Sequence, residues 1–167
     1  PLFPKGFQSE VQVITTVLSN DKENDVVVPA FLAASVALSL SDIPFNGPVS
    51  AIRVGLIDDK LVLCPTLSQQ KQSKMDVLAC TCAAGVNMIE ADAQIIDNEK
   101  VLSAIELAKN TADEVNKQIE KLVQEYGSTK KEFISVLPDE NLLAEIENKF
   151  LEDINKFLTE GADGAHI

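Results

Sequence analysis

Several stretches of the chain alternate in the manner of β-strands. In Glu10–Ser19 (EVQVITTVLS) β-branched residues dominate, apolar and polar positions alternate in part, and Glu10 carries the only charge. This pattern predicts a strand inside a sheet. Further strands are predicted over Val49–Asp58, Lys60–Thr66 and Lys74–Ile95, the last range holding two strands that reverse near Gly85. A tight turn at Asp58-Asp59-Lys60 is expected to join the first two of these strands into a hairpin.

Three other stretches repeat their apolar residues every three or four positions, which predicts helices. Pro29–Leu40 is rich in alanine, and its proline fits a first helical turn, so we expect a buried helix there. The stripe that follows Asp97 predicts a helix of about 28 residues, capped by Asp97 and ended by Gly127. Another helix is predicted over Asp139–Leu158, with a frayed end after it. The order of elements indicates an α+β fold.

A corner is predicted where the first helix gives way to the next strand. The segment Ile43–Pro48 (IPFNGP) holds two prolines, which disfavour helix in the residues before them. Asn46–Gly47 is expected to supply positive φ angles. Ser35, Ser39 and Ser41 are expected to pack and to bond the carbonyl four residues earlier, rather than to act as nucleophiles.

Composition limits the classes of function. A chain of 167 residues forms one domain, or one domain and part of another. Aromatic residues make up 5% and Trp is absent, so the core must be aliphatic. The net charge is −12; residues 1–96 hold 6 basic and 10 acidic residues, and residues 97–167 hold 8 and 16. With Arg53 as its one arginine, the chain alone is a poor binder of nucleic acid or of anionic membranes.

The cysteines Cys64, Cys80 and Cys82 are odd in number. The sequence shows neither a signal-peptide pattern nor an apolar run of about 18 residues, so we expect reduced thiols and a cytoplasmic location. Cys80 and Cys82 could join Cys64 in a metal or redox site, although no second pair completes a tetrahedral set. Small buried or half-buried thiols in strands are the simpler interpretation. His166 lies in the predicted frayed end.

Four stretches together resemble a known family. The sequences PLFPKGF, ASVALSLSDIPFNGPVSAIRVG, SKMD and MIEADAQ are similar to the first ribonuclease-PH-like core of polynucleotide phosphorylases. The resemblance implies a ribosomal protein S5 domain 2-like sheet with packed helices. It implies that residues 1–96 form part of that core without its N-terminal part, and that its last helix runs from 97 to about 126. Residues 127–167 would then begin the all-helical domain that follows.

The resemblance also implies a function. In that family two cores pack together, three subunits form a ring, and phosphate attacks RNA from its 3′ end to release nucleoside diphosphates, with help from Mg2+. The working active site belongs to the second core, and the first core shapes the ring and the RNA channel. The expected partners are therefore the second core, the homotrimer and, in the full-length enzyme only, RNA. Neither DNA nor a membrane is expected.

The family's phosphate-holding turn can be carried over residue by residue. In the active core a serine-rich turn precedes the alanine-rich helix, where hydroxyls and helix N-terminal amides hold phosphate. The matching positions here are Asn24, Asp25, Val26 and Val27. None of them is serine, and Asp25 would repel phosphate.

The acids and the lysine of the active core are also mostly replaced. Met75 and Asp76 are kept, but Leu78 stands where the active core has lysine, and Gln70 where it has an acid. Asp76 alone is a poor Mg2+ ligand, so it is interpreted as a structural remnant. We therefore expect no catalytic, cofactor-binding or metal-ligating residue in this chain, and no activity of the chain by itself.

Other positions depart from the first-core pattern. Cys80–Ala84 replaces an Ala-Gly-Thr-Arg-Asp-type turn, Cys64–Thr66 replaces Asn-Pro-Thr, and Pro29 replaces leucine. The resemblance places the basic, aromatic RNA-contacting loop before Pro1. These departures argue against catalysis and RNA binding by this chain, whereas the apolar periodicity of the fold survives.

Two alternatives to a part of a phosphorylase remain open. The chain could be a free-standing, decayed paralogue that acts as a binding or regulatory module through its acidic helices, from Asp97 to Leu158. It could also carry an independent thiol site at Cys64, Cys80 and Cys82. Whichever function holds, a first strand of the family's sheet that is missing upstream would leave an open edge, so we expect the isolated chain to self-associate or to be poorly soluble.

Overall fold

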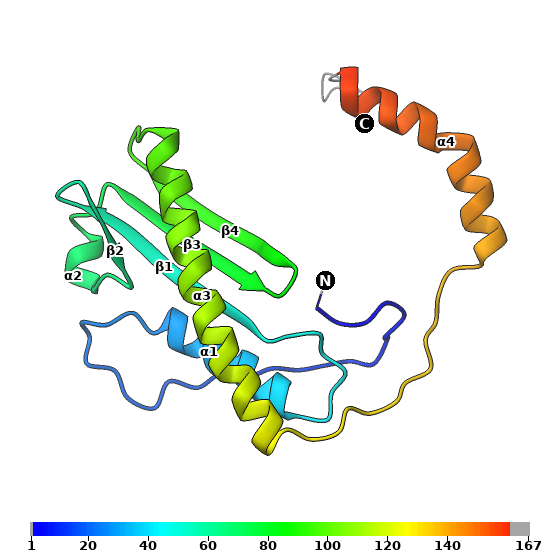
Figure 1. The fold of residues 1–167 in the computed structure, drawn as a ribbon, viewed down its shortest axis with the longest axis horizontal. Coiled ribbons are helices and arrows are strands. Elements are labelled where there is room, and N and C mark those ends of the chain that lie inside the picture. Colours follow the sequence, from blue (N-terminus) through cyan, green and yellow to red (C-terminus); the bar gives the residue numbers. More distant parts are fainter. Residues whose placement is uncertain (1, 161–167) are drawn as a thin grey trace. The chain divides into compact units, whose positions relative to one another are not determined.

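The computed structural model describes residues 2–160, and these divide into two compact units (Figure 1). The first unit contains residues 2–4 and 9–132, and it holds the whole sheet. The second contains residues 5–8 and 133–160 of the described part. The expected frayed end after residue 160 and His166 lie outside the described residues.

The order of elements confirms an α+β fold. The elements are α1 (Val27–Leu40), β1 (Val49–Ile57), β2 (Lys60–Leu63), α2 (Leu67–Gln70), β3 (Met75–Cys82), β4 (Gly85–Ala93), α3 (Asn98–Tyr126) and α4 (Glu140–Glu160). The strands form one antiparallel sheet in the order β2-β1-β3-β4. The predicted helices, hairpin and strand pair are therefore present, with ends shifted by a few residues.

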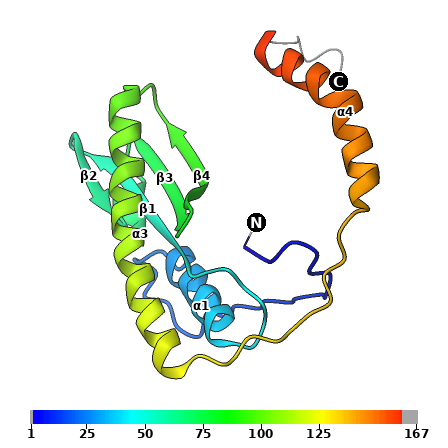
Figure 2. The ribbon, with the colours of Figure 1, turned by 45° about the vertical axis from the view of Figure 1, so that its right-hand side comes forward.

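The two faces of the sheet are covered by different helices. Because side chains alternate along a strand, Ile52 and Ala79 share one face while Ala51 and Cys80 share the other. The first face packs on α3 and the second on α1. In both ribbon views α3 runs along β1 and β3, with α1 near its C-terminal part (Figures 1 and 2).

Alanines let α3 approach the sheet closely. Ala104, Ala108 and Ala112 are fully buried against the β1 and β3 residues of the first face. Asp97 caps the helix as predicted, since its Oδ1 accepts the Glu99 amide at 3.1 Å. Gly127 ends it for a reason other than positive φ, because its φ is −70°. A Cβ there would lie 2.4 Å from the Val123 carbonyl oxygen, so the close approach requires glycine.

A buried asparagine ties α3 to the two central strands. Asn116 accepts a hydrogen bond from the Ser50 hydroxyl at 2.7 Å and donates to the Thr81 carbonyl at 2.9 Å. Ser50 and Thr81 are fully buried. The apolar periodicity of the sequence does not identify Asn116 as a core residue, because asparagine is polar.

Glu10–Ser19 does not form the predicted strand. The segment lies outside every helix and strand, and no hydrogen bond between described residues uses its backbone. The residues of the segment favour a strand, but a strand needs a neighbour to pair with, and none lies beside it in the described part of the chain. The prediction of a strand over Glu10–Ser19 was therefore wrong.

The corner after α1 also differs from expectation. Neither Asn46 nor Gly47 has a positive φ, and the corner contains a cis Gly47–Pro48 bond. The Asn46 amide donates to the Leu2 carbonyl at 2.7 Å, which holds the corner against the N-terminal segment. The tight turn predicted after β1 is present, and both Asp58 and Asp59 have positive φ, as the turns of two-residue hairpins require.

The hydroxyls of Ser35, Ser39 and Ser41 do not bond the carbonyl four residues earlier. Ser35 accepts the Val49 amide at 3.0 Å and so anchors the start of β1. Ser41 donates to the carbonyl of Leu38, three residues earlier, at 2.9 Å. The buried Ser39 hydroxyl has no hydrogen-bond partner among the described atoms. These serines remain packing and anchoring residues, with different bonds from those expected.

The side chain of Lys130 caps the C-terminal end of α1. The Nζ of Lys130 donates to the carbonyls of Leu38, Ser39 and Ser41 at 3.0, 2.9 and 2.7 Å. These carbonyls lie where a helix leaves its acceptors unused. Desolvation lowers the pKa of Lys130, and the charge of Asp42 opposes that shift. The segment after α3 is thereby fixed to the first unit.

Replacing Asn116 tests the two buried hydrogen bonds that join α3 to β1 and β3. Asn116→Ala leaves the Ser50 hydroxyl and the Thr81 carbonyl buried without their partner, so we expect a loss of about 2 kcal/mol in the free energy of unfolding. Urea denaturation followed by circular dichroism measures it. The matched control is Asn110→Ala on the exposed side of α3. Equal stability of the two variants would show that the tie contributes nothing.

Candidate functional site

A cluster of polar side chains gathers on the α1 face of the sheet, beyond the N-terminal end of α1. We call Asp25, Arg53, Gln70 and Asp76 the Arg53 cluster. Arg53 projects from β1 toward this face, and its Nε lies 3.2 Å from Asp25 Oδ2. Its Nη1 lies 3.2 Å from Asp76 Oδ2 and 3.4 Å from Gln70 Oε1. One guanidinium therefore joins three segments that are distant in sequence.

The local sequence explains how each member is placed. Asp25 lies two residues before the start of α1, and its Oδ1 accepts the amide of Val27, the first residue of the helix, at 3.0 Å. Gln70 ends the short helix α2, and its amide nitrogen donates to the Pro65 carbonyl at 2.9 Å. Asp76 lies at the start of β3 on the same face as Leu78. Each side chain is thus held by a second contact or by strand register.

The guanidinium of Arg53 is already paired with the carboxylates of the cluster. The side chains of Arg53 and Asp25 are 17% and 15% exposed, whereas Asp76 is 44% exposed. Two carboxylates therefore face one cation in a largely buried setting, where opposite charges must pair. Asp76 Oδ1 is buried and has no hydrogen-bond partner among the described atoms. The charge of Arg53 is therefore already balanced by carboxylates, which weakens its attraction for a further anion.

Sequence reasoning had named three members of this cluster without foreseeing that they meet. Asp25, Gln70 and Asp76 were picked by matching to the active core, and the structure brings all three to Arg53. Leu78, at the position of the active-core lysine, is 7% exposed and directly opposite Arg53 in the register. The signal that could have found Arg53 is its status as the sole arginine, within a strand of otherwise uncharged residues.

The remaining positions of the matched turn lack phosphate-binding chemistry. Val26 is the N-cap residue of α1 and makes no side-chain cap, and Val27 opens the helix with an exposed aliphatic side chain. Asn24 is engaged with Asp21, to which its side-chain nitrogen donates at 2.5 Å. The turn therefore offers no hydroxyl to a phosphate.

The donor set of the cluster does not fit Mg2+. The ion prefers carboxylate and water oxygens in octahedral geometry. Here one oxygen of Asp76 already pairs with Arg53, Gln70 is neutral, and the guanidinium repels a cation. Across residues 2–160 no group of three or more His, Cys, Asp or Glu side chains is arranged to hold a metal.

The three cysteines are not brought into one site. Cys80 and Cys82 are buried on the same face of β3, whereas Cys64 is exposed in the segment after β2, with a φ of 45°. All three are free thiols. Burial, followed by the negative charge of Glu90, raises the pKa of Cys80. Cys80 and Cys82 thus match the expected buried thiols of a strand, and Cys64 does not.

In the part of the chain that the structure describes, no helix has the length and apolar character needed to cross a lipid bilayer.

The model of the 3′ exoribonuclease family, domain 2, matches residues 47–111, which run from the corner after α1 into α3. Among curated proteins, a polyribonucleotide nucleotidyltransferase of Koribacter versatilis is 42% identical over 92% of this chain. Proteins of the same name from Natranaerobius thermophilus and Granulibacter bethesdensis are 35% and 51% identical over 95% and 64%. The chain spans only about a fifth of the length of these relatives, between 15% and 22%.

A solved structure supports the fold alone. The crystal structure of rice (Oryza sativa) Rrp46 aligns with a TM-score of 0.54 and 18% sequence identity. The alignment covers 61% of this chain and 49% of the rice chain.

Removing the guanidinium tests the Arg53 cluster. Arg53→Met leaves Asp25 and Asp76 facing each other without a cation, so we expect a loss of about 2 kcal/mol in unfolding free energy. Asp25→Asn in the same chain removes one of the unpaired charges, and it should recover part of the loss. A double-mutant cycle measured by urea denaturation gives the coupling. Additive effects of the two substitutions would contradict the pairing, and Lys60→Met at an exposed position serves as the control.

Thiol labelling tests the placement of the cysteines. With iodoacetamide at neutral pH, Cys64 should react first, because it is exposed. Cys80 and Cys82 should stay unlabelled until the chain is unfolded, since burial limits access and a raised pKa keeps Cys80 protonated. Peptide mass spectrometry reads the order. Early labelling of Cys80 would show that β3 is not buried as described.

Proposed function

Because the chain belongs to the polyribonucleotide nucleotidyltransferase family, we propose that it forms a non-catalytic core of a 3′-to-5′ phosphorolytic exoribonuclease. In this proposal residues 1–126 are part of the first ribonuclease-PH-like core, and residues 127–167 begin the all-helical domain. The core helps to build a trimeric ring and the wall of the RNA channel. Phosphate attack on RNA takes place in a second core outside this chain.

The Arg53 cluster is the observation that supports a non-catalytic role. By the resemblance, three of its positions, those of Asp25, Gln70 and Asp76, correspond to positions that hold phosphate or metal in an active core. Here they hold an arginine that is already paired with Asp25 and Asp76, while a neutral Gln70 and a buried Leu78 replace reactive groups. The cluster therefore stabilises the junction of α1 with the sheet instead of binding substrate.

The remaining parts of the proposal follow from the same role. RNA would contact this core only within the complete enzyme, since the chain carries a net charge of −12 and does not attract phosphates by itself. Mg2+ would serve the second core, because the donors of the Arg53 cluster do not suit it. A cytoplasmic location agrees with RNA degradation and with three free thiols.

A second candidate function rests on the exposed apolar stripe of α4. Eight apolar side chains of this helix are between 45% and 77% exposed: Leu142, Leu143, Ile146, Phe150, Leu151, Ile154, Phe157 and Leu158. Such a stripe is typical of a helix that binds a partner. A free-standing regulatory module would use it to bind an intact phosphorylase subunit. Co-elution of the two proteins in size-exclusion chromatography would favour this candidate.

A chimeric enzyme tests whether this chain acts as a structural core or as a catalytic core. The matching segment of the Koribacter versatilis relative is replaced by this chain, and the product is assayed for release of nucleoside diphosphates from RNA with phosphate and Mg2+. We expect a trimer with phosphorolytic activity, because the replaced segment supplies only structure. Asp76→Asn in the chimera should leave kcat unchanged per assembled trimer.

Two results would contradict the proposal. The first is a chimera that assembles but has no activity, or one whose kcat collapses with Asp76→Asn while assembly persists. The second is release of nucleoside diphosphates by the isolated chain under the same conditions. The intact relative is the positive control for the assay.

A further inference from the structure

The stretch LFPKGF near the start of the sequence carries part of the family resemblance, yet the proposed function gives it no role. Its first residues contact the corner after α1. The Leu2 carbonyl accepts the Asn46 amide at 2.7 Å, and the ring centroids of Phe3 and Phe45 lie 5.6 Å apart. The residues that follow, Lys5–Gln8, belong to the second unit, and we call them the strap.

Two hydrogen bonds join the strap to the chain between α3 and α4. The Val136 amide donates to the Gly6 carbonyl at 3.0 Å, and the Ser135 hydroxyl donates to the Lys5 carbonyl at 3.1 Å. Residues 133–137, which we call the strapped segment, lie outside every helix and strand. Within residues 2–160, both hydrogen bonds of this segment go to the strap.

An aromatic pair and a glycine make this contact close. The rings of Phe7 and Phe133 meet edge to face, with centroids 5.3 Å apart and planes at 89°, which is a favourable arrangement for two aromatic rings. Gly6 has a φ of 78°, and a Cβ there would lie 2.9 Å from the Val136 backbone nitrogen. The strap therefore requires glycine at this position, both for its backbone conformation and for its approach to the strapped segment.

Burial contributes little to the order of the strapped segment. Ile134, Val136 and Leu137 are 90%, 51% and 59% exposed. A segment with few buried apolar contacts and no regular secondary structure has a low free energy of local opening. The contacts with the strap are therefore the main interactions that keep this segment in place.

The chain on either side of the strapped segment is held by other contacts. Before it, the Lys131 amide donates to the Asp42 carbonyl at 2.7 Å. After it, Asp139 Oδ1 accepts the amides of Asn141 and Leu142 at 2.8 and 3.0 Å, which satisfies the N-terminal donors of α4. Loss of the strap contacts would thus leave both the anchored end of the first unit and the helix α4 intact.

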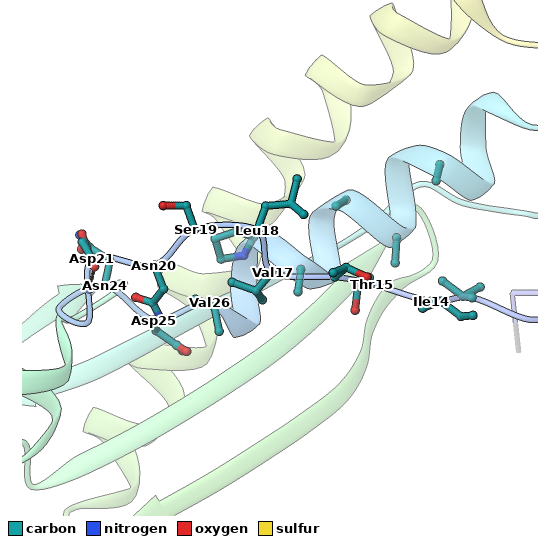
Figure 3. A pocket seen from close by; sticks show the side chains of 17 residues that line it. Ile14, Thr15, Val17, Leu18, Ser19, Asn20, Asp21, Asn24, Asp25 and Val26 are labelled. Carbon is teal, nitrogen blue, oxygen red and sulfur yellow. Dashed lines mark hydrogen bonds between the residues drawn. The ribbon is translucent and has the colours of Figure 1, made fainter.

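A cavity of about 630 Å3 beside α1 offers no comparable contact to the strap. Figure 3 shows the chain from Ile14 to Val26 running past α1, with the lining side chains around the space. Two of the polar side chains there are already engaged, Asn24 with Asp21 and Asp25 with Arg53. None of the strap residues lines this cavity, so the strap acts apart from it.

We propose that the strap is a conformational device that governs the strapped segment. Closed, it orders residues 133–137; open, it frees them and lets α4 reorient as an intact helix while the first unit stays folded. Because the strap is held by two hydrogen bonds and one ring pair, it opens without disrupting the sheet. The proposal concerns the conformation of this chain and is independent of phosphorolysis.

Amide hydrogen exchange followed by NMR on the 167-residue chain tests the strap. Gly6→Ala places a Cβ against the strapped segment, so the exchange rate of the Val136 amide should rise about tenfold or more. The amides of Val54 and Val77 in the core of the sheet should keep their rates. In the same variant, 15N relaxation should show that α4 stays helical and tumbles with greater independence than in the wild type.

Two further variants separate the contact from general destabilisation. Phe133→Leu removes the ring pair without backbone strain, and it should speed the exchange of Val136 about three- to tenfold. Lys5→Ala is the matched control, because it keeps the carbonyl that accepts the Ser135 hydroxyl and should leave the rate unchanged. If Gly6→Ala does not fold, Phe133→Leu decides the outcome for both exchange and relaxation.

Three results would overturn the proposal. The first is a Val136 exchange rate that is the same in the wild type, Gly6→Ala and Phe133→Leu. The second is a rise in the rates of Val54 and Val77 in step with Val136 in Phe133→Leu, which would show that the segment opens only when the sheet unfolds. The third is relaxation of α4 that does not change although Val136 exchanges faster.

Discussion

The close approach of α3 to the sheet is the constraint on which the first unit depends. Ala104, Ala108 and Ala112 have no exposed surface, and their small size brings the helix backbone near to β1 and β3. At that separation Asn116 can reach across to both strands. A core built from Val, Ile, Leu, Met and Ala needs such proximity, because few large side chains are present to fill space.

The sequence was informative wherever a segment's own pattern decides its structure. Asp97 and Gly127 marked the ends of α3, and the paired aspartates marked the β1–β2 turn, because caps and turns depend on a few adjacent residues. Glu10–Ser19 shows the limit, since its residues favour a strand but pairing requires a neighbour that local pattern does not reveal. Asn116 was missed for a related reason, as a polar residue becomes part of a core only through partners distant in sequence.

At the candidate site, too, the sequence indicates positions but not the contacts between them. Matching to an active core pointed to Asp25, Gln70 and Asp76, and the fold brings these three side chains together at Arg53. It could not reveal that Arg53 pairs with Asp25 and Asp76, because a salt bridge depends on the register of β1 with β3 and on where α1 begins. Charges that would have to stay available for a ligand are here satisfied by one another.

The lysine that caps the C-terminal end of α1 also anchors the backbone that leads toward the second unit. Lys130 is held by three carbonyls, and the Lys131 amide bonds the Asp42 carbonyl at 2.7 Å, so the backbone is fixed to the first unit up to that point. The chain passes between the units three times, after residues 4, 8 and 132. Of these three passages, the one after residue 132 follows directly on backbone that is anchored by hydrogen bonds to residues 38–42.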